Sequence, residues 1–337
     1  MHLWGRNHVR SWLILSAVLA FMTPLRAAEW DDVIVAARKE GSVTVYSALI
    51  GPPAIARMKA FEAAYGIRVD QFIGRASEVS ERIRMEHATR RPIGDIYIAS
   101  PATLPLHAMA GEIQPAMQVP NASNLRDDIE IDKNGVPGWY PPYGILANAK
   151  QVGPDEIKSW KDLLNPKWKG RMIGDDLRLS GAGASMFEAT YKTFGREYHE
   201  QLAKQEYLVT RNNRGAERQV ANGEYAIYFP QQLPYALALK GLPVRMIAPV
   251  EGWVYASANF ALLKDSPHPN AARLLTNFML EPESQLAFAN AGLIPVTKGT
   301  IERANEAARP FLNTKLMGAG TFELQQKMME LAAGIYK

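Results

Sequence analysis

The chain has 337 residues and no cysteine, which excludes disulfides, thiolate metal sites and a catalytic thiol. Lysine and arginine number 38 against 34 aspartates and glutamates, and three of the arginines fall within the first 28 residues, which hold no acid. The remainder is therefore nearly neutral, with 35 basic against 34 acidic residues, and gives no electrostatic case for binding nucleic acid. A remainder of about 300 residues exceeds one typical hydrophobic core, so we expect two lobes.

Residues 1–28 have the pattern of a secretion signal. Two arginines precede an apolar run, Ser11–Met22, that is too short to span a bilayer, and Ala27 and Ala28 follow as a cleavage region. A larger residue stands where a small one is preferred, and an uncleaved anchor or a buried helix is the alternative. We expect a cleaved signal, export to the periplasm and a soluble mature chain, because no later stretch approaches 18 uninterrupted apolar residues.

The first part of the mature chain alternates strands with helices. Strands are expected at Val43–Tyr46, Ile67–Phe72 and Asp95–Ala99, and helices at Pro53–Tyr65, Ser77–Ala88 and Pro101–Ala110. Ser77 precedes two acids and is the expected N-cap of its helix. This alternation predicts βαβ units and a parallel sheet.

In the middle of the chain the alternation of strands and helices is first interrupted and then resumes. Residues 112–138 are irregular, and the extended segment Trp139–Ala149 with its paired prolines is the expected connection between lobes. For the second lobe we expect helices at Ser159–Leu164, Ala184–Phe194 and Ala216–Ala221, and strands at residues 171–176, Val209–Arg211, Ala226–Phe229 and Val244–Ala248.

The last third is expected to return to the first lobe. A strand at Tyr255–Leu263 marks the crossing, and helices follow at Pro269–Leu280, Pro282–Ala291 and Phe322–Ile335, the last with one apolar face. We therefore predict that residues 29–141 and about 258–300 form lobe 1 and residues 142–257 form lobe 2. Residues 301–337 are expected to be a C-terminal helical segment that packs on the lobes.

Several segments, in this order and spacing, resemble one family. They are VTVYSA (43–48), GRASEVSERI (74–83), DIYIAS (95–100), YGILANAK (143–150), SWKDLLNPKWKGRM (159–172), GAGAS (181–185), VANGEYAIYF (220–229) and SPHPNAARLLTNFML (266–280). The chain resembles the extracellular solute-binding proteins of ABC importers, in the branch that contains ferric-iron, phosphonate and phosphosugar binders.

That resemblance implies an α/β fold of the type II periplasmic binding class. Each of two lobes is then a mixed, mainly parallel sheet flanked by helices, and hinge strands join the lobes around a cleft. Closure over a small solute presents a changed surface to a membrane permease. We expect a monomer without a cofactor.

Three turns after strands of lobe 1 supply candidate ligand-binding residues. Ser47 and Ala48 offer a hydroxyl and backbone N–H groups, or else Ser47 only caps its turn. Arg75 is either a partner for a carboxylate or phosphonate or a solvated arginine, and Ser77 follows in the same turn. Ser100 repeats the geometry of Ser47. Ligands of open α/β sheets bind beyond the carboxyl ends of the strands, where these turns lie.

The glycine-rich turn SGAGAS supplies candidates from lobe 2. Gly181 and Gly183 allow close approach of the backbone on either side of Ala182, and Ser180 or Ser185 can add a hydroxyl. The turn lacks the lysine of a P-loop and the full GxGxxG pattern, so we exclude nucleotide binding. In the family that the chain resembles, this turn carries ligand contacts.

Other candidates depend on the nature of the ligand. Arg214 is either an anion clamp or a surface arginine, and Tyr143 either stacks on a ligand or packs between lobes. Tyr228 and Gln231 are expected contacts to an organic solute. The adjacent acids at 175 and 176 either serve a cationic ligand or cap a turn, and the turn is the favoured interpretation.

An iron site is not predicted. Iron binders in the resembling family show two adjacent tyrosines here, whereas in this chain Phe229 follows Tyr228, and position 48 is an alanine. One phenolate with an uncertain Glu78 leaves a hard Fe(III) ion short of anionic oxygen ligands, so we expect no metal site.

Catalysis is not predicted either. His87, His107, His199 and His268 show no metal-ligand spacing, and no G-x-S-x-G elbow occurs. The expected function is the periplasmic substrate-binding component of an ABC importer that captures a small organic anion, of carboxylate or phosphonate type, by hinge closure. The alternatives are a periplasmic sensor of the same fold, a ferric-iron binder with an atypical site, and a secreted two-lobe hydrolase or transferase.

Overall fold

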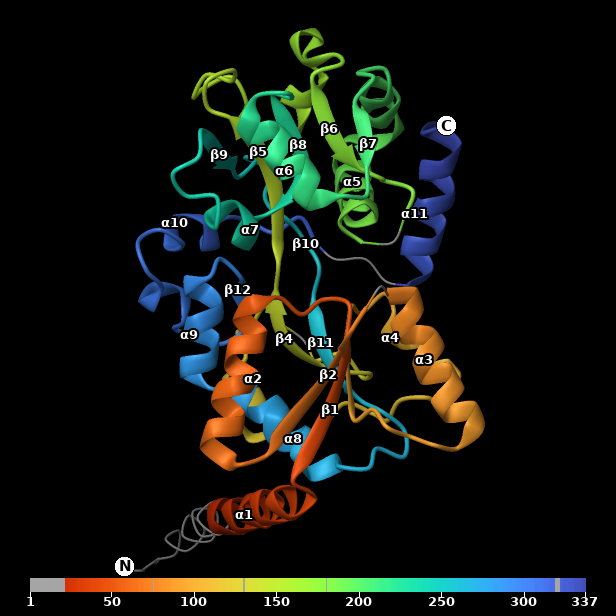
Figure 1. Ribbon diagram of the computed structural model, residues 1–337, viewed down its shortest axis with the longest axis vertical. Helices are drawn as coiled ribbons and strands as arrows, with labels where there is room; N and C mark the ends of the chain where they lie inside the picture. Colours follow the sequence, from red (N-terminus) through yellow and green to blue (C-terminus); the bar gives the residue numbers. More distant parts are fainter. Residues whose placement is uncertain (1–21, 75, 130, 180, 319–321) are drawn as a thin grey trace, which may run out of the picture.

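The computed structural model describes residues 22–74, 76–129, 131–179, 181–318 and 322–337. The described residues form two mixed β-sheets, each covered by helices (Figure 1). Most of the predicted signal, residues 1–21, lies outside the described residues, as do Arg75 and Ser180. In the described part of the chain, no helix combines the length and apolarity needed to cross a membrane.

The first sheet is the core of lobe 1, the name used here for the part of the molecule built on it. Its strands lie in the order β12 (Ile294–Pro295), β4 (Val136–Tyr140), β11 (Ala258–Leu262), β3 (Ile96–Ala99), β1 (Ser42–Ser47) and β2 (Arg68–Ile73). β1 is parallel to both β2 and β3, as the βαβ pattern predicts, whereas β11 is antiparallel to its two neighbours. The carboxyl ends of β1, β2 and β3 therefore share one edge of the sheet.

Helices pack against both faces of this sheet. They are α1 (Met22–Glu40), α2 (Pro52–Tyr65), α3 (Ala76–Thr89), α4 (Leu104–Met109), α8 (Pro269–Met279) and α9 (Pro282–Asn290). In α2, prolines occupy the first turn, Gly66 ends the helix in the left-handed conformation, and Met58 and Phe61 are fully buried. The Phe61 and Phe278 rings meet edge to face at 5.5 Å between centroids. Burial of each such side chain stabilises the fold by roughly 1.5–3 kcal/mol.

The second sheet is the core of lobe 2. Its strands lie in the order β10 (Val254–Tyr255), β5 (Pro142–Asn148), β8 (Ile227–Gln232), β6 (Met172–Asp175) and β7 (Leu208–Thr210), and β9 (Val244–Ile247) also pairs with β5. Its helices are α5 (Ala182–Ala203), α6 (Asn213–Asn222), α7 (Leu233–Leu237) and α11 (Phe322–Ile335). β6 is parallel to β7 and β8, so these strands end on the side that faces lobe 1 (Figure 1).

Between β4 and β11 the chain crosses between the sheets at two adjacent places, and it passes from lobe 1 to lobe 2 once more between α10 (Arg309–Leu312) and α11. It leaves the first sheet at Pro141, between β4 and β5, and returns across Ala256 and Ser257, between β10 and β11. The Tyr140 and Tyr255 rings, one from each connection, stack at 5.0 Å with an angle of 25° between their planes. The two extended connections therefore form one narrow hinge through the middle of the molecule (Figure 1).

The C-terminal helix α11 packs on lobe 2, while α10 (Arg309–Leu312) packs on α9 of lobe 1. Met328 and Ala332 of α11 join the apolar core of lobe 2. The Tyr336 hydroxyl lies 2.7 Å from His199 Nδ1, and burial lowers the pKa of His199 to about 3, so this histidine is neutral at physiological pH.

The structure corrects the predicted starts of two helices. α3 begins at Ala76, so Ser77 lies inside the helix and is not its N-cap. The helix expected from Pro101 begins only at Leu104, because a turn closed by the Thr103 N–H and the Ser100 carbonyl comes first.

Other differences are changes of length or type. α5 extends past Phe194 to Ala203, across a break at Gly195, whose φ of 76° is left-handed. The helix expected at Ser159–Leu164 is a 3₁₀ turn of Trp160–Leu164 that Ser159 caps. The strand expected at Tyr255–Leu263 is two strands, because the chain changes sheets within it.

We predict that Gly144→Ala lowers the free energy of unfolding by about 1–3 kcal/mol, because an added methyl in a packed core must displace its neighbours. A Cβ at this position of β5 would overlap the Trp253 ring and the Ile247 carbonyl oxygen. Gly334→Ala, on the exposed side of α11 with open space around it, is the control and should gain up to about 1 kcal/mol. Chemical denaturation of the three proteins measures both effects, and equal stability of wild type and Gly144→Ala would contradict the packing argument.

Candidate functional site

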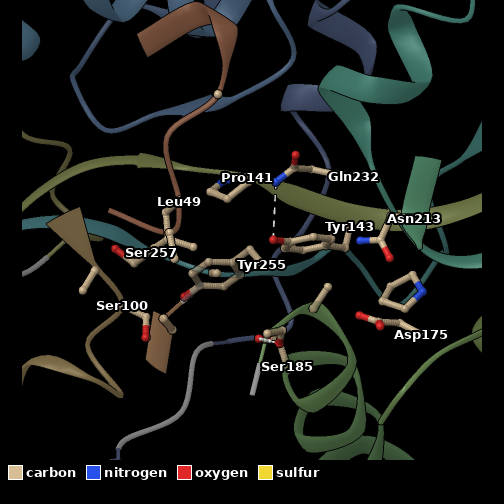
Figure 2. A pocket seen from close by; sticks show the side chains of 18 of the residues that line it. Leu49, Ser100, Pro141, Tyr143, Asp175, Ser185, Asn213, Gln232, Tyr255 and Ser257 are labelled. Carbon is tan, nitrogen blue, oxygen red and sulfur yellow. Dashed lines mark hydrogen bonds between the residues drawn. The ribbon is translucent and has the colours of Figure 1, made fainter. Parts of the chain in front are cut away.

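A cavity of about 790 Å³ lies where the two lobes meet the hinge, within the size range of small-molecule sites. Both connections contribute to its wall, through Pro141 and Tyr143 on one and Tyr255 and Ser257 on the other. Figure 2 shows Ser100 and Leu49 of lobe 1 on one side of this space, with Tyr143, Asp175 and Ser185 of lobe 2 on the other. The cavity therefore belongs to both lobes.

The lobe 1 wall consists of the turns that follow its parallel strands. Ala48, Ser77 and Ser100 line the cavity as predicted sites, together with Leu49, which the sequence analysis did not select. The Ser100 hydroxyl lies 3.1 Å from the Thr103 hydroxyl, within the same turn.

Ser47 lies behind this wall and not among the residues that line it. It is fully buried, its hydroxyl donates to the Ile98 carbonyl at 2.8 Å, and the hydroxyl accepts the Leu49 N–H at 2.8 Å. These bonds correspond to the turn-capping alternative, in which Ser47 fixes the loop that carries Ala48 and Leu49.

The lobe 2 wall includes the start of α5. Gly181 and Ala182 line the cavity, and Ser185 lies one turn further along the helix. Gly183 lies behind them, where its N–H donates to Asp175 Oδ2 at 3.1 Å. A side chain at Gly183 would overlap the Asp176 carbonyl, so glycine is needed for α5 to begin this close to β6.

Carboxylates form part of the lobe 2 wall. The sequence analysis considered the acids at 175 and 176 as possible ligand contacts but favoured a role in the turn, and it did not select Glu188 or Glu217. Asp175, Asp176, Glu188 and Glu217 line the cavity. Three of these are ion-paired: Asp176 with Arg178 at 2.8 Å, Glu188 with Lys192 at 2.7 Å, and Glu217 with Arg214 at 3.1 Å. The net charge near this wall is therefore less negative than its four carboxylates alone would make it.

Asp175 differs from the other three. Its carboxylate accepts backbone N–H groups from Asp176 at 2.9 Å and from Gly183 at 3.1 Å. Burial nevertheless raises the pKa of Asp175, whereas the hydrogen bonds from Arg178 lower the pKa of Asp176. Two adjacent acids thus have opposite electrostatic environments.

Tyrosines supply the aromatic part of the wall. Tyr143, Tyr228, Tyr235 and Tyr255 line the cavity, and Tyr97 and Trp139 of lobe 1 also contribute to its lining. The Tyr143 hydroxyl accepts a hydrogen bond from Gln232 Nε2 at 3.4 Å (Figure 2). The Tyr228 hydroxyl is buried without a hydrogen-bond partner among the described residues, and burial raises its pKa.

Gln231 and Arg214, which the sequence analysis also predicted as ligand contacts, both hold other residues of this wall in place. Gln231 lines the cavity, and its side-chain amide donates to Glu217 Oε1 at 3.1 Å. Arg214 is not among the lining residues. It pairs with Glu217 and lies over the Tyr235 ring, 3.9 Å from the centroid, so it fixes two lining residues.

Two chains of serine, histidine and carboxylate occur in lobe 1. Ser80 lies 3.1 Å from His107 Nε2, and His107 Nδ1 lies 2.6 Å from Glu112. The other consists of Ser42, His268 and Asp95, with distances of 3.3 and 3.0 Å. Neither serine lines the cavity, where the hydrolase alternative requires its nucleophile.

The second chain has an evident structural role. Asp95 also accepts the backbone N–H groups of Thr44 and His268, at 2.7 and 2.8 Å, and therefore joins β1 to the start of α8. The described residues contain no group of three or more histidines, aspartates or glutamates placed to hold a metal ion.

Comparisons with known proteins agree on the kind of molecule. The sequence model of a family described as "Bacterial extracellular solute-binding protein" matches residues 107–316. An uncharacterized protein of Haemophilus influenzae is 24% identical over 295 residues, which cover 81% of this chain and 83% of that protein.

Solved structures share the fold at low sequence identity. Iron-bound HitA from Pseudomonas aeruginosa superimposes with a TM-score of 0.73 at 23% identity, covering 87% of this chain and 99% of HitA. The periplasmic binding protein AfuA from Actinobacillus pleuropneumoniae, with fructose-6-phosphate bound, gives a TM-score of 0.70 at 20% identity. The match covers 86% of this chain and 97% of AfuA. The predicted type II periplasmic binding fold is thereby confirmed.

The opposite environments of the adjacent acids predict opposite pH effects on stability. The pKa of Asp175 is raised on folding, so its ionisation disfavours the folded state as pH rises above the unfolded value of about 3.9. The pKa of Asp176 is lowered, so its stabilisation is complete above about 3.9 and is lost as pH falls through the folded value.

We therefore expect the stability of Asp175→Asn, relative to wild type, to increase between about pH 4 and pH 7. The stability of Asp176→Asn should lie below that of wild type by a nearly constant amount over this interval, and the difference should shrink only as the pH falls below about 4. Thermal unfolding of the three proteins at several pH values measures the two trends. Parallel trends for the two variants would show that their environments do not differ in this way.

Proposed function

The chain belongs to the family of bacterial extracellular solute-binding proteins, and we propose that it is the periplasmic substrate-binding component of an ABC importer. In this proposal it captures a small organic anion between its lobes, closes about the hinge and delivers the solute to a membrane permease. The protein acts as a monomer and makes no covalent change to the solute.

The observation that supports an anion is the meeting of helix N-termini from both lobes at one cavity. Ala76 and Ser77 at the start of α3 line it from lobe 1, and Ala182 of α5 and Asn213 of α6 line it from lobe 2. The first turn of a helix has backbone N–H groups without intrahelical partners and a partial positive charge. Such ends bind carboxylate, phosphonate and phosphate groups.

Apart from Asp175, the remaining lining is compatible with an anion. Ser77, Ser100, Ser185 and Ser257 line the cavity. The Ser185 and Ser257 hydroxyls donate to the Gly181 carbonyl oxygen and to Asn259 Oδ1, so Ser77 and Ser100 are the serines proposed to donate to the solute. The cations that pair with Asp176, Glu188 and Glu217 remove most of the repulsion that these acids would exert. Recognition is then local, as expected for a chain that is nearly neutral outside its first 28 residues.

The hinge supports closure as the mechanism. Two extended connections, at Pro141 and at Ala256 with Ser257, join the sheets, and residues of both line the cavity. A small rotation about such connections changes the separation of the lobes while each hydrophobic core stays intact.

Ferric iron is a second candidate cargo, because the cavity lining holds hard oxygen donors. Five tyrosines and Asp175 line it, and phenolate and carboxylate oxygens suit a hard cation. Of the structures with this fold, that of HitA is described as iron-bound. This candidate and the organic anion make different predictions for the same variants and probes.

We predict that Ala182→Asp lowers the affinity for the organic anion at least about tenfold, because its carboxylate would occupy the end of α5 that the anion needs. Ala182→Asn is the matched uncharged control and should retain more of the affinity. The aspartate is favourable at a helix N-terminus, so the ligand-free protein should unfold at the same or a higher temperature. Isothermal titration measures affinity, and tighter binding of a ligand by Ala182→Asp would identify a cationic cargo.

A thermal-shift screen of the purified mature protein should detect its class of ligand. We expect stabilisation by members of a panel of carboxylates, phosphonates and phosphate esters, since a ligand that binds the native state raises the unfolding temperature. Fe(III) supplied with a weak chelator should leave the temperature unchanged. Stabilisation by Fe(III) alone, with a visible phenolate charge-transfer absorption, would replace the organic anion by iron.

A further inference from the structure

The Tyr228 hydroxyl is an unusual feature of the cavity wall. The residue is 1% exposed, lines the cavity, and has no hydrogen-bond partner for its hydroxyl among the described residues. Buried hydroxyls are nearly always paired in native proteins, because an unmade hydrogen bond opposes folding. A partner supplied by a molecule in the cavity would account for this one.

Sheet register places Asp175 close to this hydroxyl. Ile173 of β6 is opposite Tyr228 of β8, and Asp175, two residues beyond Ile173, projects from the same face of the sheet. Helix α6 covers this face, where Ala216 and Val220 pack with Tyr228 and where Glu217 also lines the cavity. The charges of Asp175 and Glu217 both act on the Tyr228 hydroxyl and, with burial, raise its pKa.

The side chains of Tyr228 and Asp175 can each form further hydrogen bonds, whereas both carboxylate oxygens of Glu217 already have side-chain partners. Each Glu217 oxygen has a partner, Gln231 on Oε1 and Arg214 on Oε2. Asp175 accepts one backbone N–H on each oxygen and has no side-chain partner at hydrogen-bond distance in the described part of the chain, so each oxygen can accept another donor. Tyr228 has an O–H group to donate and lone pairs to accept.

A hydroxyl group satisfies both residues at once through a single oxygen atom. It accepts the Tyr228 proton and donates its own to Asp175. An ammonium group can donate to Asp175 but leaves the Tyr228 proton without an acceptor, and a carboxylate or phosphate can accept from Tyr228 but is repelled by Asp175. We propose that Tyr228 and Asp175 form a subsite for a hydroxyl group of the solute, which makes the cargo a hydroxylated organic anion.

This inference rests on the proposed function for the anionic half of the solute, which the helix N-termini bind. The hydroxyl subsite lies on the sheet of lobe 2, between β6 and α6. A solute that joins the two would carry its acidic group and its hydroxyl on different carbons, as phosphorylated polyols and sugar acids do.

Matched probes that differ only in hydroxyl groups test the subsite. Glycerol 3-phosphate is compared with propyl phosphate, and glycerate with propionate, by isothermal titration. We expect the hydroxylated member of at least one pair to bind wild-type protein at least about tenfold more tightly, and Tyr228→Phe to reduce that ratio to about one to three. Tyr225→Phe is the matched control, because Tyr225 packs against the same cluster but does not line the cavity.

The possible results separate this inference from the proposed function. Binding of acids by wild type without a preference for the hydroxylated member in either pair would overturn the hydroxyl subsite and leave the anion proposal standing. Binding of glucose, with no response to any of the acids, would overturn the anion proposal, and loss of that binding in Tyr228→Phe would support the subsite.

Stability of the ligand-free protein gives a test that needs no ligand. Because the Tyr228 hydroxyl has no partner in the described residues, Tyr228→Phe should unfold at the same or a higher temperature than wild type. Tyr198→Phe, which removes a buried hydroxyl that donates to the Trp160 carbonyl at 2.9 Å, should unfold several degrees lower. A comparable drop in Tyr228→Phe would show that its hydroxyl has a structural partner, and the subsite would be rejected.

Discussion

The direction of the parallel strands is the constraint on which the cavity depends. β1, β2 and β3 of one sheet, and β6, β7 and β8 of the other, end on the sides that face each other across the hinge. A parallel strand is followed by a turn and then by the N-terminus of a helix, so both lobes present loops and positive helix ends to the same space. Residues far apart in the sequence, such as Ser77 and Ala182, thus line one cavity.

Local sequence patterns predicted many of the strands and helices of the fold. The alternation of strands and helices predicted the parallel pairs of β1, and the apolar face of Phe322–Ile335 predicted α11 with the same bounds. Errors arose where local and tertiary preferences differ. Ser77 and the acids after it have the sequence pattern of a helix N-cap, yet α3 begins one residue before Ser77. The segment Tyr255–Leu263 has the pattern of one strand, and the point at which it passes from one sheet to the other leaves no mark in that pattern.

The candidate site was less accessible to sequence reasoning. Residues after strand ends could be predicted to line a cleft, because that rule depends only on chain direction. The different environments of Asp175 and Asp176 depend on Gly183, whose N–H bonds one acid, and on Arg178, which pairs with the other. The missing partner of the Tyr228 hydroxyl is a property of its whole surroundings, and the pattern IYFPQQ carries no sign of it.

Strand order has a consequence for the synthesis of the chain. β11 lies between β3 and β4 in the first sheet, although it follows all of the lobe 2 strands in sequence. The ribosome therefore synthesises all strands of lobe 2 before it synthesises β11. Until residues up to Leu262 have emerged, β3 and β4 lack the strand that pairs with both of them in the first sheet. Contacts across such sequence separations form slowly. In a nascent chain of this topology, β3 and β4 therefore stay unpaired with β11 until late in synthesis, so the sheet of lobe 1 is the last of the two sheets to be completed.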